Sequence, residues 1–192
     1  MVPLRVLVAC EYSGRVREAF RKLGHAAWSC DLLPSEDASE FHEQCDVFNA
    51  INFYGPWDLM ICHPPCTHLA VSGARHFARK RESGEQQAAL EFVKRLLDAP
   101  IEKIALENPV SIISSHIRPA DQYIQPWQFG HGETKKTGLW LKNLPKLVPT
   151  NIVEGREARV HKMAPSPDRW KERSRTYQGI ADAMAAQWGT LH

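Results

Sequence analysis

A short apolar run that ends in two prolines is the feature that most limits how this chain can fold. Residues 59–62 read Leu-Met-Ile-Cys, which is typical of a buried strand, and Pro64 and Pro65 follow at once. Neither proline can donate a hydrogen bond to a sheet ladder, so the strand must stop there. The chain then leaves along a stiff path that presents Cys66 beyond the carboxyl end of the strand. Ligands of open α/β sheets bind at that end, so Cys66 is a candidate nucleophile as well as a candidate small core residue.

A second apolar run carries an acidic residue at the same expected edge. Residues 101–106 are followed by Glu107, Asn108 and Pro109. The proline is expected to halt the strand and to leave Glu107 at the carboxyl edge, on the same side as Cys66. Two motifs in this order, each at a strand end, predict one catalytic site.

The remaining apolar patterns predict a single α/β domain over residues 1–192, doubly wound, with a mostly parallel sheet and helices on both faces. Residues 4–9 are almost continuously apolar, as in a parallel strand that is covered on both sides. Further strands are expected at 25–30, at 45–47 and on both sides of a turn within 125–141. Helices are expected at 16–23, 85–97 and 180–188, a solvated loop or short helix at 34–44, and irregular structure at 145–173.

Composition narrows the class of protein. With 43% hydrophobic and 24% charged residues, the chain is ordinary for a soluble globular protein. It has no apolar run of the roughly 20 residues that a membrane helix needs, and its first ten residues lack the layout of a signal peptide. Five cysteines do not suggest a disulfide framework, so we expect a reducing cytoplasm. A net charge of +2 neither requires nor excludes nucleic acid.

The loop from Pro64-Pro65-Cys66 to Gly73 resembles the catalytic loop of the C5-specific cytosine DNA methyltransferases. Glu107 and Asn108 match the family's Glu-Asn pair, whereas Pro109 stands where the family has Val. With gaps, the resemblance covers most of the chain and is nearest to short phage and prophage members. It implies the Rossmann-like fold of class I methyltransferases, S-adenosylmethionine (SAM) as cofactor and DNA as partner.

The resemblance also implies catalytic roles. Cys66 would add to C6 of a cytosine flipped out of the duplex, which makes C5 nucleophilic enough to take a methyl group. Glu107 would act as the acid at ring nitrogen N3, and Asn108 would orient Glu107 or the Cys66 loop. When a closed loop buries the site around the bound base, we expect that burial to raise the pKa of Glu107.

For the cofactor, the strand-turn-helix at residues 8–20 resembles the first motif of SAM methyltransferases, although Gly14 is its single glycine. An ordinary βα turn would look similar. Asp31 directly follows the second strand, where a carboxylate can accept hydrogen bonds from ribose hydroxyls. The residues expected to contact SAM are Glu11, Ser13, Gly14, Asp31, Asp46 and Pro64.

For DNA, a basic run follows the catalytic loop and contains Arg75, Arg79, Lys80 and Arg81. It is either a solvated face or a mobile segment that clamps phosphates, as the corresponding family loop does. Lys135 or Lys136 would replace an Arg with which longer members contact the target base. Residues 145–173 are too few for a separate target-recognition domain, so a recognition partner or a homodimer is possible.

The sequence also allows other functions. Cys62, His63, Cys66 and His68 could bind a metal ion, but no second pair of ligands follows, and we expect no metal. The chain could instead methylate free pyrimidine nucleotides, transfer a modified group, or bind SAM or DNA without turnover.

Overall fold

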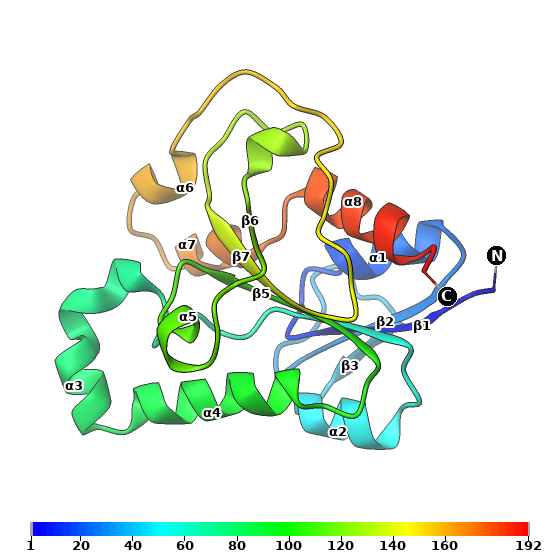
Figure 1. Ribbon diagram of the computed structural model, residues 1–192, viewed down its shortest axis with the longest axis horizontal. Coiled ribbons are helices and arrows are strands. Elements are labelled where there is room, and N and C mark those ends of the chain that lie inside the picture. The colour runs from blue at the N-terminus through cyan, green and yellow to red at the C-terminus, as the bar shows by residue number, and fades with distance from the viewer. Residues whose placement is uncertain (1, 192) are drawn as a thin grey trace.

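Seven strands form one sheet in the computed structural model, which describes residues 2–191 (Figure 1). In chain order they are β1 (Arg5–Ala9), β2 (Ala26–Asp31), β3 (His42–Gln44), β4 (Leu59–Cys62), β5 (Lys103–Pro109), β6 (Gln122–Ile124) and β7 (Thr137–Lys142). Their order across the sheet is β3-β2-β1-β4-β5-β7-β6. Strands β1 to β5 are parallel, and β7 is antiparallel to both neighbours. The sheet is therefore doubly wound and mostly parallel, with one antiparallel strand inserted, which confirms the predicted fold class.

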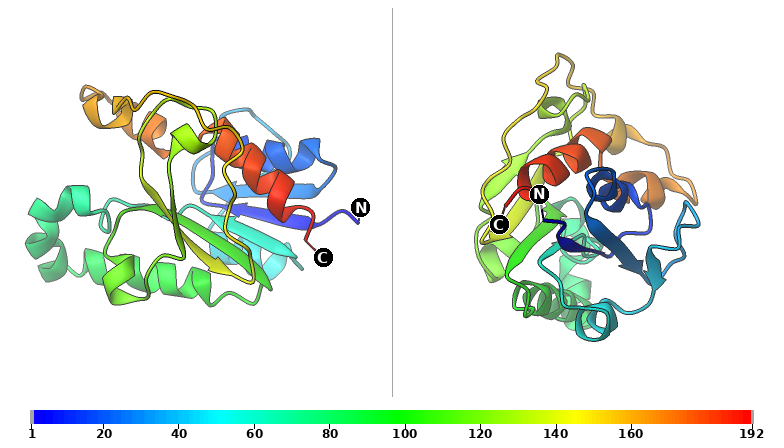
Figure 2. Two further views of the ribbon diagram at one scale, coloured as in Figure 1. Left: turned by 45° about the horizontal axis from the view of Figure 1, so that its top comes forward. Right: turned by 90° about the vertical axis from the view of Figure 1, so that its right-hand side faces the viewer.

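Helices cover both faces of this sheet (Figures 1 and 2). They are α1 (Arg15–Lys22), α2 (Val47–Phe53), η1 (Val71–His76), α3 (Phe77–Glu82), α4 (Glu85–Leu97), α5 (Ile113–His116), η2 (Pro126–Gln128), α6 (Arg159–Lys162), α7 (Arg169–Ser174) and α8 (Gln178–Trp188). Helices α1 and α8 lie on one face, and α2, α4 and α5 lie on the other. No helix within residues 2–191 has the length and apolar character that crossing a membrane requires.

Burial on both faces explains why the strands are apolar without alternation. In β1, Val6 and Val8 point into the core beneath α1 and α8, where they join Phe20 and Trp188. Leu7 belongs to the second core, beneath α2 and α4. Successive side chains of a strand point to opposite faces, so a strand covered twice must be apolar at every position.

The structure corrects several predicted elements. Helix α2 was not predicted, and Asp46 does not end a strand: its carboxylate accepts a hydrogen bond of 2.8 Å from Phe48 N and caps α2. The polar segment 34–44, expected to be a loop or a short helix, ends in strand β3. Strand β5 continues through Pro109, because β7 pairs with it as far as Thr137 and that terminal pair does not need the missing N–H.

Two further corrections concern the second half of the chain. The first strand of the expected strand-turn-strand unit lies earlier, at Gln122–Ile124, and Pro126 begins a short 3-10 turn where that strand was expected. Segment 145–173 is mostly irregular, as predicted, but it also contains α6 and α7.

Candidate active site

The candidate site lies where β1 and β4 are neighbours and their following helices go to opposite faces of the sheet. In a doubly wound sheet this switch point opens a crevice at the carboxyl ends of the strands. Two connections border it here: residues 11–14, which lead from β1 into α1, and residues 63–66, which follow β4.

The Cys66 loop is held by contacts with β5 and with α3. The buried side-chain amide of Asn108 donates a hydrogen bond of 3.0 Å to the carbonyl oxygen of Pro64. On the other side the Lys80 ammonium donates to the carbonyl oxygen of Thr67. These bonds leave Cys66 half-buried on a fixed turn. Asn108 thus contacts the loop itself, which was one of the two roles expected for it.

Glu107 lies beside the same loop and forms an ion pair that the sequence did not suggest. Its Oε2 is 3.1 Å from Nδ1 of His63, and each of the two side chains is 12% exposed. The His63 backbone N–H donates to the carbonyl oxygen of Ala9 at 3.0 Å, so the imidazole starts from a fixed position in the sheet. The sequence suggested His63 only as a possible metal ligand. The fold shows that its partner is the carboxylate of Glu107.

In this structure, the pKa of Glu107 moves in the direction opposite to the one expected for a site closed around the base. Burial alone would raise the pKa of its carboxyl, as predicted, but the neighbouring His63 outweighs burial, and Lys135 and the Thr176 hydroxyl act in the same direction. The pKa of Glu107 is therefore below its usual range. The pKa of His63 moves the other way: burial opposes its charged form, but the carboxylates of Glu107 and Glu11 overcome that effect and raise it. Each of the two side chains thus favours the charged form of the other.

Of the two candidate lysines, Lys135 lies at the site. Its ammonium donates a hydrogen bond of 2.8 Å to the carbonyl oxygen of Arg173. Burial lowers its pKa, while Glu107 and Cys66 act in the opposite direction, so all three side chains share one environment. Lys136 is exposed and lies over the ring of Tyr123, 4.6 Å from its centroid.

On the β1 side of the site, Glu11 accepts hydrogen bonds from the start of α1. Its buried carboxylate accepts hydrogen bonds from the backbone N–H groups of Val16 at 2.8 Å and Arg17 at 3.2 Å. The Ser13 hydroxyl also donates to Glu11, at 3.3 Å. Burial raises the pKa of Glu11 in spite of these bonds. The first turn of α1 therefore already holds an anion supplied by the chain.

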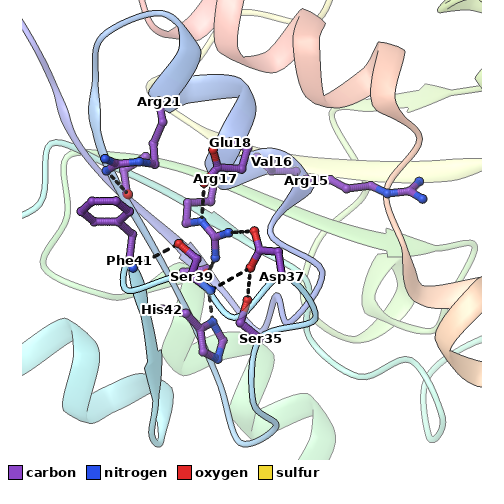
Figure 3. A network of polar contacts seen from close by, with 12 residues as sticks. Arg15, Val16, Arg17, Glu18, Arg21, Ser35, Asp37, Ser39, Phe41 and His42 are labelled. Atoms are coloured by element: carbon purple, nitrogen blue, oxygen red, sulfur yellow. Dashed lines mark hydrogen bonds and ion pairs between the residues drawn. The ribbon is translucent and has the colours of Figure 1, made fainter.

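A buried arginine supports this turn (Figure 3). The fully buried Arg17 donates to Ser29 Oγ at 2.8 Å and pairs with Asp37. Gly14 begins the helix with φ of 72°, and a Cβ there would lie 2.4 Å from Arg17 Nη2. Glycine is thus required both by the left-handed backbone and by the guanidinium packed against it. The pair of Arg17 and Asp37 also ties the loop after β2 to α1.

The other expected cofactor residues lie at the same edge of the sheet. Asp31 ends β2, and its Oδ1 accepts a hydrogen bond of 2.9 Å from Leu33 N. Burial raises the pKa of Asp31. Asp46 is exposed at the start of α2. The Tyr12 hydroxyl donates to the carbonyl oxygen of Lys171 at 3.1 Å, so α7 folds back over the turn after β1.

The basic segment after Cys66 forms η1 and α3 and presents three exposed arginines. They are Arg75, Arg79 and Arg81. Lys80 differs from the expected phosphate contact, because its side chain is buried and its ammonium is bonded to Thr67. Figures 1 and 2 place α3 and the α6–α7 segment at the same end of the molecule.

The side chains of the four candidate metal ligands do not converge on one point but have different neighbours. Cys62 is fully buried, and its thiol donates to the carbonyl oxygen of Ala105 at 3.6 Å. His63 faces Glu107, and His68 Nδ1 lies 4.0 Å from Glu85. Over residues 2–191, no group of three or more His, Cys, Asp or Glu side chains is arranged to hold a metal ion.

Comparison with known proteins relates the fold to methyltransferases. No protein-family model matches the chain, and no curated protein sequence matches it significantly. Among solved structures, it is similar to a protein assigned as a DNA modification methyltransferase encoded within an E. coli prophage, with a TM-score of 0.50 and 13% identity. It is also similar to the Entamoeba histolytica methyltransferase EhMeth, with a TM-score of 0.51 and 12% identity.

The likeness covers most of this chain and a smaller part of the other two proteins. It spans 85% of this chain and 56% of the prophage protein, and 86% of this chain and 61% of EhMeth. At such low identity the likeness establishes a shared methyltransferase-like fold. Function has to be argued from the site.

Proposed function

We propose that this protein transfers a methyl group from SAM to C5 of cytosine in DNA. The observation that carries the proposal is the meeting of Cys66, Glu107 and Asn108 at the carboxyl edge of β4 and β5, with the Asn108 amide bonded to the Cys66 loop. The fold that the chain shares with two methyltransferases supports the proposal. Residues 1–192 would then act as one catalytic domain in the cytoplasm.

The residues around the turn after β1 fit SAM better than a dinucleotide. A dinucleotide places its phosphates on the backbone N–H groups at the start of the first helix. Here the Glu11 carboxylate takes the N–H groups of Val16 and Arg17, so that position is filled. SAM has a nucleoside and a sulfonium but no phosphate, and a carboxylate in this place does not oppose it. SAM would lie along Ser13, Gly14, Asp31, Asp46 and Pro64, beside Glu11.

When bound, SAM supplies the methyl group, and the chain prepares the base that receives it. The Cys66 sulfur adds to C6 of cytosine, and the ring electrons that this addition moves to C5 allow C5 to attack an electrophilic methyl. Glu107 hydrogen-bonds N3 and stabilises the charge that develops on the ring. Asn108 holds the Pro64 carbonyl, which keeps Cys66 in place for this attack. A base, with water as the simplest one, then takes the C5 proton, and the electron pair of the C5–H bond re-forms the C5–C6 double bond as the C6–S bond breaks and the thiolate leaves.

DNA would enter at the end of the molecule where α3 lies. The exposed Arg75, Arg79 and Arg81 would contact phosphates on that side. Lys135, beside Glu107 and Cys66, would contact the flipped base in place of the Arg of longer enzymes. The segment with α6 and α7 is short, so we infer that a recognition partner or a second copy of the chain contributes to target choice.

The test is an analysis of modified nucleosides combined with a covalent trap. The protein is incubated with SAM and either DNA or free pyrimidine nucleotides, and 5-methylcytosine is measured by mass spectrometry. With 5-fluorocytosine DNA we expect a SAM-dependent adduct on the peptide that contains Cys66, because fluorine cannot leave C5 as a proton does. Cys66→Ser should abolish the adduct, and Glu107→Gln should slow its formation.

Cys45→Ser is the matched control, since Cys45 is also a partly exposed free thiol and lies outside the proposed chemistry. This variant should form the adduct at the parent rate. Methylation of free nucleotides but not of DNA would replace the proposed substrate. Full activity in Cys66→Ser, or an adduct on another cysteine, would refute the proposed mechanism.

A further inference from the structure

Four ionisable side chains from separate parts of the chain influence one another electrostatically near the Cys66 loop, and two of them form an ion pair. His63 follows β4, Glu107 lies in β5, Glu11 is in the turn before α1, and Lys135 directly precedes β7. The carboxylates of Glu107 and Glu11 both act on His63, and Lys135 acts on both His63 and Glu107. The group holds two acids and two bases in largely buried surroundings, so its protons are shared within a small set of partners.

Existing hydrogen bonds decide which members of this group can exchange a proton with Glu107. The Glu11 carboxylate is committed to the N–H groups of Val16 and Arg17. The Lys135 ammonium donates one hydrogen bond to the carbonyl oxygen of Arg173 and, within the described part of the chain, forms no hydrogen bond or ion pair with Glu107, so it acts on that carboxylate through its charge. His63 Nδ1 lies 3.1 Å from Glu107 Oε2, close enough for direct transfer. Both His63 Nε2 and Glu107 Oε2 are buried and have no hydrogen-bond partner among residues 2–191, so the 3.1 Å ion pair is the main polar contact of the imidazole, and a small rotation of either side chain would align it for transfer.

The charge state described above creates a difficulty for the proposed chemistry. A carboxyl group must carry a proton to donate a hydrogen bond to N3 of cytosine. The pKa of Glu107 is lowered and that of His63 is raised, so the pair favours the carboxylate on Glu107 and the proton on the imidazole. A proton held by the pair therefore resides on His63 and not on the residue that faces the base.

We propose that His63 is the proton store of Glu107, and that it releases its proton to the carboxyl when a pyrimidine ring occupies the site. This role rests on the proposed function. In the step, the Nδ1–H bond of the imidazolium breaks, its electron pair stays on the neutral imidazole, and an O–H bond forms on Glu107 Oε2. The carboxyl then donates to N3. When the base leaves, the proton returns to Nδ1, so the pair neither gains nor loses a proton over the cycle.

Binding of the base favours this transfer for an electrostatic reason. A flipped cytosine excludes water from Glu107 and supplies N3 as an acceptor, and both effects favour the protonated carboxyl. In the open site the imidazolium and the carboxylate balance each other's charge, so the pair stays ionised. His63 is thus a positioning residue that acts through Glu107. It is distinct from the nucleophile and does not touch the base.

The pair can be tested without any catalytic assay, by NMR titration of the histidine Cε1–H signals. The chain has nine histidines, and His63→Asn identifies the signal of His63 by its loss. In the parent protein we expect His63 to titrate above the ordinary value of about 6.5. In Glu107→Gln its midpoint should move to lower pH, because the carboxylate that stabilises the imidazolium is gone. A parent midpoint at or below the ordinary value, or one that Glu107→Gln leaves unchanged, would overturn the proposal.

The catalytic readout is the pH dependence of methyl transfer. His63→Asn keeps a neutral N–H donor near the position of Nδ1 but cannot release a proton at neutral pH. We expect kcat to fall about 10- to 100-fold and the alkaline limb that belongs to the parent pair to disappear. SAM binding should be retained. His116→Asn, at an exposed position on α5, is the matched control and should keep the parent profile.

The two readouts separate this inference from the proposed function. A parent protein that makes no 5-methylcytosine refutes the function, and the role of His63 falls with it. A parent that methylates DNA, with a pH profile that His63→Asn does not alter, refutes the role of His63 alone. The NMR comparison needs His63→Asn only to assign the His63 signal, and His63→Gln can make the same assignment if His63→Asn folds poorly.

Discussion

The hydrogen bond from Asn108 to Pro64 should control how firmly Cys66 is held. Asn108→Ala removes a donor from a buried carbonyl oxygen at 3.0 Å, a change that typically costs about 1–3 kcal/mol of stability. The same change removes Asn108 Oδ1, which is buried without a partner within residues 2–191, so the cost should lie near the lower end. Asn108→Asp should cost more, because it places a carboxylate in that buried position, facing a carbonyl oxygen.

Asn108→Ala should reduce the reaction rate at Cys66 by a larger factor than its modest loss of stability would suggest. A shift of about 1 Å in a reacting group can reduce a rate by about 100-fold, so we expect adduct formation at Cys66 to slow by about 10- to 100-fold in Asn108→Ala. Two measurements check this: urea unfolding, and the rate at which iodoacetamide labels the Cys66 peptide, which should rise as the loop loosens. Asn49→Ala, on the exposed side of α2, is the control. If Asn108→Ala labels and reacts at the parent rate, the loop is held by its other contacts and our reasoning is wrong.

Two further predictions test packing and DNA binding. In Gly179→Ala the new Cβ would lie 1.9 Å from the carbonyl oxygen of Phe129, so an overpacking cost of about 1–3 kcal/mol should exceed the gain in helix propensity of about 1 kcal/mol, and thermal unfolding should shift down. Gly73→Ala, which meets only ordinary van der Waals neighbours, should change little. Replacing the three exposed arginines of the basic segment by Gln should lower the slope of log K against log salt by about 0.9 for each arginine that binds a phosphate, whereas Lys80→Gln should not change the slope. The substituted positions are Arg75, Arg79 and Arg81. An unchanged slope in the triple variant would mean that the basic face does not touch DNA.

Patterns that repeat locally predicted much of the fold. The strands over 4–9, 25–30 and 59–62 and the helix over 85–97 were found close to their expected bounds, because each is an apolar run or an amphipathic repeat with a clear end. Helix α2 was missed because its seven residues are too few for a repeat to show. The continuation of β5 through Pro109 depends on β7, a partner nearly thirty residues later, which no local pattern reveals.

The candidate site, too, could be predicted from the sequence only in part. Cys66, Glu107 and Asn108 stand next to prolines at strand ends, so their place at one edge of the sheet could be predicted. The charge of Glu107 could not, because it depends on His63 and on Lys135, which reaches the site from the segment before β7. The sequence could indicate that burial raises the pKa of Glu107. It could not indicate that His63 and Lys135 together lower that pKa by more than burial raises it.

The packing of α8 on α1 has a consequence for how the protein is made. The core beneath them joins Val16 and Phe20, near the start of the chain, to Met184 and Trp188. Until Trp188 has left the ribosome, the apolar side of α1 lacks the helix that packs against it, and the core between α1 and the sheet is incomplete. The sheet can pair earlier, but this face is fully covered only after α8 has been made. We therefore expect a nascent chain that stops short of α8 to be held by chaperones or to aggregate, and folding to be completed only as that helix docks.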